Sequence, residues 1–119
     1  GKNILNCKVL VMGVTFKEDV SDIRNSRVPD IISELKSYGV QVDVVDAFAN
    51  SNEVNHEYGF HLVEKPATNY DAVIVAVSHV QYKNLTEDYF RSITNGKAIM
   101  VDVKGIYRGN IHEMTYWSL

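Results

Sequence analysis

The stretch that decides the fold begins with "VLVMG" at residues 9–13, continues with "VTFKEDVSDIRNSR" at residues 14–27 and ends with "VPDIISELKSYG" at residues 28–39. The first part is a continuous apolar run closed by a glycine, which is typical of a strand buried on both faces. The last part repeats apolar residues at helical spacing, with Gly39 as a stop signal. A buried strand, a polar loop and an amphipathic helix therefore follow one another, as in the first half of a βαβ unit.

The same alternation of apolar and amphipathic runs continues along the chain. Ser26 is predicted to cap the first helix, and Thr86 is predicted to cap the last one. The pattern predicts one α/β domain over residues 1–119, a Rossmann-like three-layer α/β/α sandwich with a mainly parallel sheet of about five strands. The predicted strands are 9–13, 40–47, a short weak one at 60–63, 70–78 and 97–105, and a short second helix is predicted at 51–59.

Composition restricts the classes of partner. The 119 residues carry a net charge of −3 and have an isoelectric point near 5.7, which argues against nucleic acid because phosphate backbones select basic surfaces. The single cysteine, Cys7, fits the reducing cytoplasm, and the apolar runs are too short to span a membrane. Four scattered histidines lack metal-ligand spacing, so no metal site is predicted. Gly1 stands in place of a methionine and is interpreted as a remnant of cloning or as the start of a piece of a longer protein.

Candidate ligand-binding residues follow the predicted strands, because open parallel sheets bind ligands at the carboxyl ends of their strands. Phe16 and Lys17 follow the first strand, and Lys104 follows the last. Arg24 and Arg27 stand close to the start of the first helix. Cations that converge near strand ends and a helix start indicate an anionic ligand such as a phosphate or pyrophosphate.

Each of these residues also has an ordinary structural interpretation. Lys17 and Arg24 lie among acids and fit solvated loop charges in weak ion pairs, and Lys104 fits a surface residue after a strand. Asp46 ends the second strand, where Rossmann domains keep a ribose-binding acid, but without a G-x-G-x-x-G motif it is interpreted as a turn aspartate. His79 is interpreted as a rim histidine with satisfied hydrogen bonds rather than as a catalyst.

A specific motif lies within the opening stretch. The pattern G-x-x-F-K-x-x-x-x-D-x-R-x-S, together with "HEYG" at 56–59, "YDAVIVAVSH" at 70–79 and "VDVKG" at 101–105, resembles the C-terminal UDP-binding domain of the UDP-glucose/GDP-mannose dehydrogenase family over nearly the whole chain. The "TFKE…DIRNS" form is most similar to the branch that oxidises UDP-N-acetylhexosamines for Vi or capsular polysaccharides. The motif residues present here are Gly13, Phe16, Lys17, Asp22, Arg24 and Ser26.

The resemblance implies a much longer enzyme, of which residues 1–119 are one domain. An N-terminal domain would bind NAD, and a central helical region would carry the catalytic cysteine and build a homo-oligomer. The enzyme would oxidise the C6 alcohol of a UDP-hexose to a carboxylate in two hydride transfers. Phe16, Lys17 and Lys104 would contact the UDP-sugar, although Lys104 stands where several branches have an arginine, and lysine lacks the bidentate fork. Arg24 would reach the NAD, and the domain alone would have no catalytic residue and no activity, since Cys7 does not match the catalytic cysteine.

Two other classes of protein share parts of this pattern. A receiver domain also alternates strands and helices and has a lysine after its last strand, but it needs acids directly after the first strand to hold magnesium, where this chain has "GVTF". A stand-alone Rossmann-like binding or dimerisation module is the other alternative, and the missing glycine motif weakens its NAD-binding form. Binding of UDP or of magnesium distinguishes these classes. The identity of the sugar stays open at this point.

Overall fold

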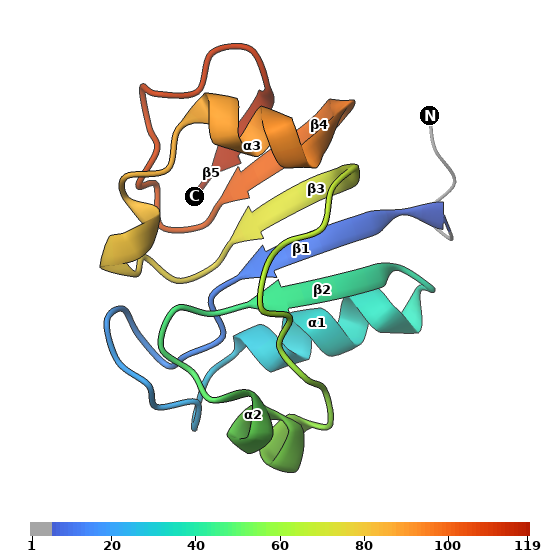
Figure 1. Cartoon of the computed structure of the whole chain (residues 1–119), viewed down its shortest axis with the longest axis vertical. Helices are drawn as coiled ribbons and strands as arrows, with labels where there is room; N and C mark the ends of the chain where they lie inside the picture. The colour runs from blue at the N-terminus through green and yellow to red at the C-terminus, as the bar shows by residue number, and fades with distance from the viewer. Residues whose placement is uncertain (1–5) are drawn as a thin grey trace.

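The computed structural model describes residues 6–119, so Gly1 lies outside the described residues. Five parallel strands form one sheet in the order β2-β1-β3-β4-β5, and all the arrows point the same way (Figure 1). The predicted Rossmann-like α/β class is therefore confirmed. The strands are β1 (Lys8–Met12), β2 (Gln41–Val45), β3 (Tyr70–Val75), β4 (Thr94–Asp102) and β5 (Thr115–Ser118), and the helices are α1 (Val28–Ser37), α2 (Ser51–Tyr58), the 3₁₀ turn η2 (Val80–Tyr82) and α3 (Glu87–Ile93).

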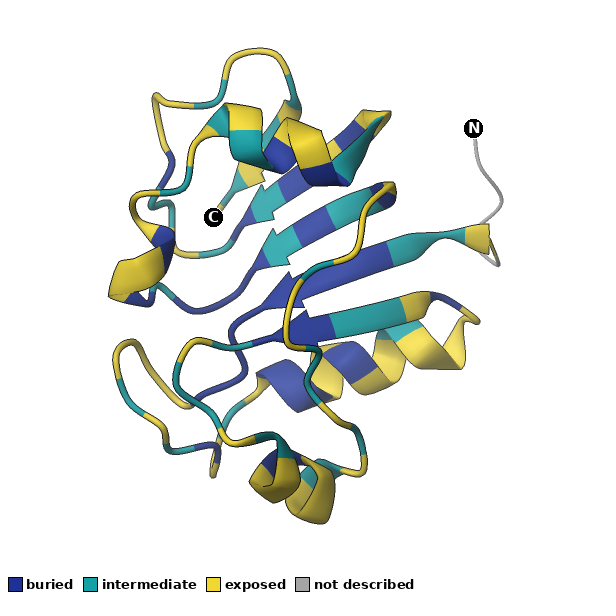
Figure 2. Cartoon of the chain, in the orientation of Figure 1, coloured by how far each residue is buried: buried dark blue, intermediate teal, exposed yellow. Residues whose placement is uncertain are grey.

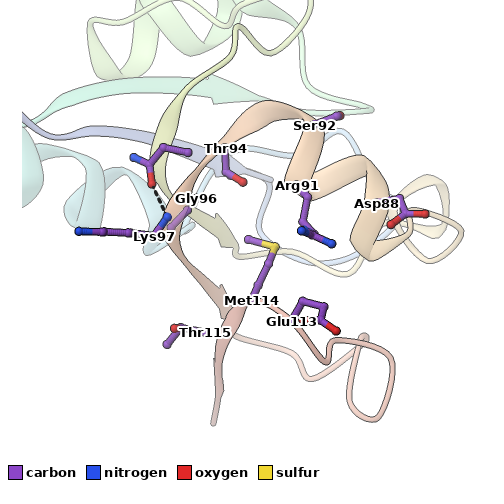
Figure 3. Close-up of a pocket in the computed structure, with 11 residues that line it drawn as sticks. Asp88, Arg91, Ser92, Thr94, Gly96, Lys97, Glu113, Met114 and Thr115 are labelled. Carbon is purple, nitrogen blue, oxygen red and sulfur yellow. Dashed lines mark hydrogen bonds between the residues drawn. The ribbon is translucent and has the colours of Figure 1, made fainter.

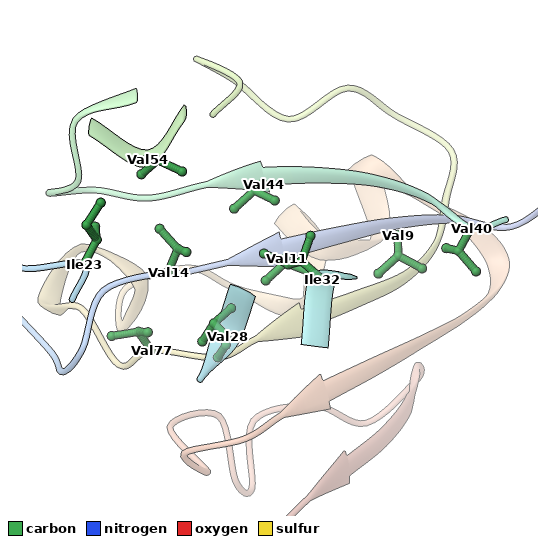
Figure 4. Packing of buried hydrophobic residues seen from close by; sticks show 11 residues of the cluster. Val9, Val11, Val14, Ile23, Val28, Ile32, Val40, Val44, Val54 and Val77 are labelled. Atoms are coloured by element: carbon green, nitrogen blue, oxygen red, sulfur yellow. The ribbon is translucent and has the colours of Figure 1, made fainter. Parts of the chain in front are cut away.

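The inner strand β1, between β2 and β3, is buried on both faces, as the apolar run at 9–13 predicts. Val9 and Val11 face the side covered by α1 and α2, where they pack in one cluster with Ile32 of α1 (Figure 4). Leu10 and Met12 face the other side and pack with α3 and with β4. Figure 2 shows this burial in the middle of the sheet, with exposed residues on the outer sides of the helices. Helices therefore cover both faces, and the carboxyl ends of the strands form one edge.

The helix caps test the predicted boundaries. Thr86 caps α3 as predicted, with its hydroxyl accepting a hydrogen bond from the backbone N–H of Tyr89 at 3.2 Å. The prediction for α1 was wrong by one residue, because Arg27 occupies the N-cap position without a side-chain cap. Ser26 still accepts a hydrogen bond from the N–H of Val28 at 3.2 Å.

Two predictions at the margins of the sheet were wrong. The segment 60–63 is not a strand: it runs past β2 with one hydrogen bond, from Val63 N–H to the carbonyl of Val44 at 2.8 Å, and has no ladder. The fifth strand is instead β5, which pairs in parallel with β4 and leaves Trp117 53% exposed. A half-exposed edge strand of four residues has no continuous apolar run, so its sequence pattern is weak.

A sharp turn after β1 starts the long loop that leads to α1. Gly13 has a positive φ of 99°, and a Cβ atom there would lie 2.5 Å from the Cβ of Val77. Only glycine fits this close approach between the end of β1 and the segment after β3. Within residues 6–119, no helix has the length and apolar character needed to cross a membrane.

Candidate functional site

A groove of about 320 Å³ lies at the carboxyl edge of the sheet, between the β1–α1 loop and the segments that follow β3 and β4. Phe16, Lys17 and Lys104, the three residues predicted to bind substrate, all line this groove. The structure thus brings together residues from opposite ends of the chain. Arg27, considered from the sequence only as one loop cation among several, lines it as well, and its position next to the start of α1 was the available signal.

The turn after β1 places Lys17 and Phe16 in this groove. Thr15 is buried, and its hydroxyl donates a hydrogen bond to the carbonyl of Lys17 at 2.8 Å. The N–H of Phe16 donates to the carbonyl of Asp22 at 2.8 Å, which closes the loop on itself. The Phe16 ring is left 56% exposed, and Lys17 is exposed beside it. An exposed ring next to a free ammonium group suits a ligand with both an aromatic and an anionic part.

The second cation of the groove stands on a loop held by a buried acid. The carboxylate of Asp102, at the end of β4, accepts hydrogen bonds from the N–H groups of Ile106 and Tyr107 at 3.1 and 2.8 Å. Gly105, which lies between Asp102 and Ile106 in the chain, has a φ of 70°, and a Cβ there would lie 2.7 Å from the guanidinium carbon of Arg108. The tight turn directs the chain away from the sheet just after Lys104, which leaves this residue exposed at the edge.

Arg24, the residue predicted to contact the cofactor, lies outside this groove. Its guanidinium group forms an ion pair with Asp22, with Nε 3.1 Å from Oδ1, and its side chain is 79% exposed. The hydrogen bond to Arg24 lowers the pKa of Asp22, and the same contact raises the pKa of Arg24. Arg24 lines a separate hollow of about 390 Å³ together with two acids of α2, Glu53 and Glu57. The loop therefore presents its cations in two directions.

Asp46 is a turn aspartate, as the structural interpretation proposed. One carboxylate oxygen accepts hydrogen bonds from the N–H groups of Phe48 and Ala49, both at 2.8 Å, and the other accepts from Val14 N–H at 2.7 Å and from Nε2 of His79 at 3.1 Å. Burial alone raises the pKa of Asp46, but the hydrogen bonds from His79 and the backbone outweigh it and leave the pKa lowered. The carboxylate is fully enclosed by protein groups.

The most voluminous of the described hollows lies elsewhere. It measures about 570 Å³ and is lined by α3, the start of β4 and the segment before β5 (Figure 3). Arg91 and Lys97 are offset there by Asp88 and Glu113. It lies at the amino ends of β4 and β5, the edge at which open parallel sheets do not bind ligands, so the smaller groove at the carboxyl edge is the candidate site.

Sequence comparison gives a consistent group of relatives. A family model described as "UDP-glucose/GDP-mannose dehydrogenase family, UDP binding domain" matches residues 10–109. The UDP-N-acetyl-D-glucosamine 6-dehydrogenase of Salmonella typhi is 40% identical over 105 residues, which are 87% of this chain and 25% of that protein. Protein CapL of Staphylococcus aureus is 38% identical over 107 residues, or 89% of this chain and 25% of CapL. The chain thus spans about a quarter of the length of these relatives.

Solved structures share the fold. The NDP-N-acetyl-D-galactosaminuronic acid dehydrogenase from Methanosarcina mazei Go1 superposes with a TM-score of 0.84 at 20% identity, covering 99% of this chain and 25% of that one. The UDP-N-acetyl-mannosamine dehydrogenase Cap5O from S. aureus gives a TM-score of 0.76 at 22% identity, covering 97% of this chain and 27% of that one. At such identities the likeness concerns the fold alone, and it agrees with the parallel sheet described above.

Proposed function

Because the chain belongs to the UDP-glucose/GDP-mannose dehydrogenase family, as its UDP-binding domain, we propose that it binds the UDP part of a UDP-sugar through Phe16, Lys17 and Lys104. In the whole enzyme the domain would serve an NAD-dependent oxidation of the sugar C6 alcohol to a carboxylate in two hydride transfers. UDP-N-acetylhexosamine is the proposed substrate class, because two of the relatives are named UDP-N-acetyl-D-glucosamine 6-dehydrogenase and UDP-N-acetyl-D-mannosamine dehydrogenase. The receiver-like and stand-alone alternatives are not favoured, since the matches are to dehydrogenases.

The observation that carries the proposal is the shared groove of Lys17 and Lys104. The two residues come from the first and the last crossover segments of the chain, yet they line one hollow together with the exposed Phe16 ring. Two ammonium groups suit the charge of a diphosphate, and an aromatic side chain suits the flat face of a base. Arg27 lines the same groove, so three cations stand around the place proposed for a ligand with a diphosphate.

The residues of this chain do not fit NAD as a complete site of its own. The β1–α1 loop has one glycine, Gly13, in place of a G-x-G-x-x-G motif, and the Asp46 carboxylate has its hydrogen bonds taken by protein groups, so it is not free for a ribose. Arg24 is exposed and long enough to reach a ligand held elsewhere. We therefore propose Arg24 as a contact to NAD bound mainly by a second domain.

The whole-protein context is also part of the proposal. The chain would act as the C-terminal domain of a cytoplasmic homo-oligomer, with N-terminal and central domains as its partners. Half of a cleft cannot orient a hydride donor against its acceptor, so the 119-residue chain by itself is expected to show no dehydrogenase turnover. Reduction of NAD by the purified chain in the presence of a UDP-sugar would contradict this expectation.

Titration of the 119-residue chain with UDP, followed by NMR, tests the proposal directly. A few charge-assisted contacts without enclosure amount to about 4 kcal/mol, which corresponds to a millimolar dissociation constant. The amide signals of Phe16, Lys17 and Gly105 are expected to shift together. Signals of Gly96 and Lys97, at the opposite edge, serve as the internal control, and shifts confined to them would refute the site.

A further inference from the structure

His79 is a buried polar residue that takes no part in lining the groove. Its side chain is 0% exposed and lies just beyond β3, between the turn that carries Lys17 and the end of β2. Nδ1 accepts a hydrogen bond from the backbone N–H of Asp19 at 2.9 Å. Nε2 lies 3.1 Å from the Asp46 carboxylate and 3.2 Å from the hydroxyl of Thr15. Both ring nitrogens are therefore used, and each binds a different segment of the chain.

These partners define where the ring carries its proton. A backbone N–H can only donate, so Nδ1, which faces Asp19, must be the unprotonated acceptor. The ionised carboxylate of Asp46 can only accept, so Nε2 must carry the hydrogen. The hydroxyl of Thr15 donates to the carbonyl of Lys17 and offers its lone pair to Nε2. The geometry thus requires a neutral imidazole with its proton on Nε2.

The same contacts hold the turn at both ends of Lys17. On one side, Thr15 links the Lys17 carbonyl to the His79 ring. On the other side, Asp19 is bound twice, through its N–H to Nδ1 and through its carboxylate to the N–H of Val80 at 2.7 Å. Asp19 has a φ of 59°, a left-handed conformation that costs free energy for a residue with a side chain and needs such contacts to persist.

We propose that His79 is a positioning residue for nucleotide binding, which fixes the turn carrying Phe16 and Lys17 through the contact of its Nδ1 with the Asp19 N–H, without touching the nucleotide. The proposal rests on the proposed UDP-binding function. A purely structural alternative exists, because the ring also packs against Phe48 and Tyr82 at centroid distances of 4.8 and 5.5 Å. A purely structural role predicts that loss of either ring nitrogen weakens UDP binding equally. The positioning role predicts a larger loss when the contact between Nδ1 and Asp19 is removed.

Two substitutions separate the ring nitrogens. In His79→Asn the amide oxygen stands near the Nδ1 position and keeps an acceptor for Asp19, while in His79→Gln the amide nitrogen stands near Nε2 and keeps a donor for Asp46. We expect His79→Gln to speed exchange of the Asp19 amide about tenfold and to raise the dissociation constant of UDP about fivefold. His79→Asn is expected to stay within about twofold of the wild type in UDP affinity.

Two control variants and one spectrum of the wild type complete the comparison. His112→Gln changes an exposed histidine away from the turn and should leave both readouts unchanged. Met100→Ala removes a buried side chain of β4 and should lower the thermal unfolding midpoint without selective loss of protection at Asp19. A long-range ¹H–¹⁵N spectrum of the wild type should show Nε2 protonated and Nδ1 unprotonated, as in a neutral imidazole.

Each outcome bears on one part of the proposal. If His79→Gln and His79→Asn weaken UDP binding equally, in proportion to their loss of stability, His79 is a core residue and the positioning role is overturned. The opposite tautomer in the wild-type spectrum also overturns it. If the wild-type chain shows no UDP binding, the function proposal and the nucleotide part of this one fail together, while exchange at Asp19 still decides whether His79 holds the turn.

Discussion

The two halves of the loop between β1 and α1 both combine cations with acids but are held in different ways. The first half, residues 15–19, is tied through His79 to the ends of β2 and β3, with Thr15 and the ring of His79 buried. In the second half, the chain is anchored at buried Ile23, whose carbonyl accepts a hydrogen bond from the hydroxyl of Tyr58. The Arg24 side chain itself extends into solvent beside Asp22.

This difference separates two uses of a cation. Lys17 stands on a turn whose backbone is fixed, so its ammonium group is delivered to a groove of this domain. Arg24 is bound to a neighbour two residues away, in an exposed pair that costs little to break. Such a side chain can exchange its partner for an anion presented by another body. One continuous motif therefore places one cation on a fixed turn and the other in an exposed ion pair.

The largest expected effect concerns the first half of the loop, residues 15–19, which is tied to β2 and β3 through His79. Asp46→Asn removes a buried charge and turns an amide hydrogen toward groups that donate, so the free energy of unfolding should fall by about 3 kcal/mol. Urea denaturation measures this loss. A decrease below about 1 kcal/mol would show that the network around His79 contributes little to holding the loop.

The next effect concerns ligand binding in an enzyme that contains this domain. Lys17→Ala should weaken binding of the UDP-sugar by about tenfold or more and should change NAD binding little, because it removes a charge-assisted contact in the groove. Arg24→Ala should mainly weaken NAD, and Arg24→Lys should restore only part of that loss if the guanidinium fork binds a pyrophosphate. Equilibrium binding of each ligand decides, and two alanine variants that bind both ligands normally would return these charges to ordinary solvated surface.

A smaller effect is expected in the pH dependence of the free energy of unfolding, through Asp46, which holds the first half of the loop. The pKa of Asp46 lies below its ordinary value of 3.8, so folding favours the ionised form; this contribution is present above pH 3.8 and is lost as the pH falls through the lowered pKa. The wild type should therefore lose stability in this acid range more steeply than Asp46→Asn. Glu87→Gln is the control, since the pKa of Glu87 is also lowered, through hydrogen bonds from the N–H groups of His112 and Met114. Parallel slopes for wild type and Asp46→Asn would contradict the assignment.

The smallest effect is expected in the second half of the loop, at the exposed pair of Asp22 and Arg24. Asp22→Asn breaks an exposed ion pair and should change the thermal unfolding midpoint by no more than about 2 °C. Neither Asp22 nor Arg24 lines the groove, so UDP binding there should be unaltered in this variant. A large drop in the midpoint would mean that the pair holds the loop, and the contrast between the halves would disappear.

The sequence by itself determined the strand and helix alternation, the parallel sheet and the edge at which the cations gather. These follow from local periodicity: β1 and β3 contain continuous apolar runs, at 9–12 and 72–75, and α1 repeats apolar residues along one face. The carboxyl-edge rule then places Lys17 and Lys104 on the same side without any knowledge of contacts. The boundaries drifted by a few residues, as at the start of β4, because local pattern does not define the last hydrogen bond of a ladder.

Only the tertiary structure decided which residues share a groove and which buried side chains hold it. β5 exists because β4 offers it a partner, and a segment of four residues carries too little pattern of its own. Arg24 was separated from Lys17 by the path of the loop, and His79 met Asp19 and Asp46 only when three strand ends converged. A hydrogen bond between residues distant in sequence depends on angles and distances fixed by the whole packed sheet, and no spacing along the chain encodes them.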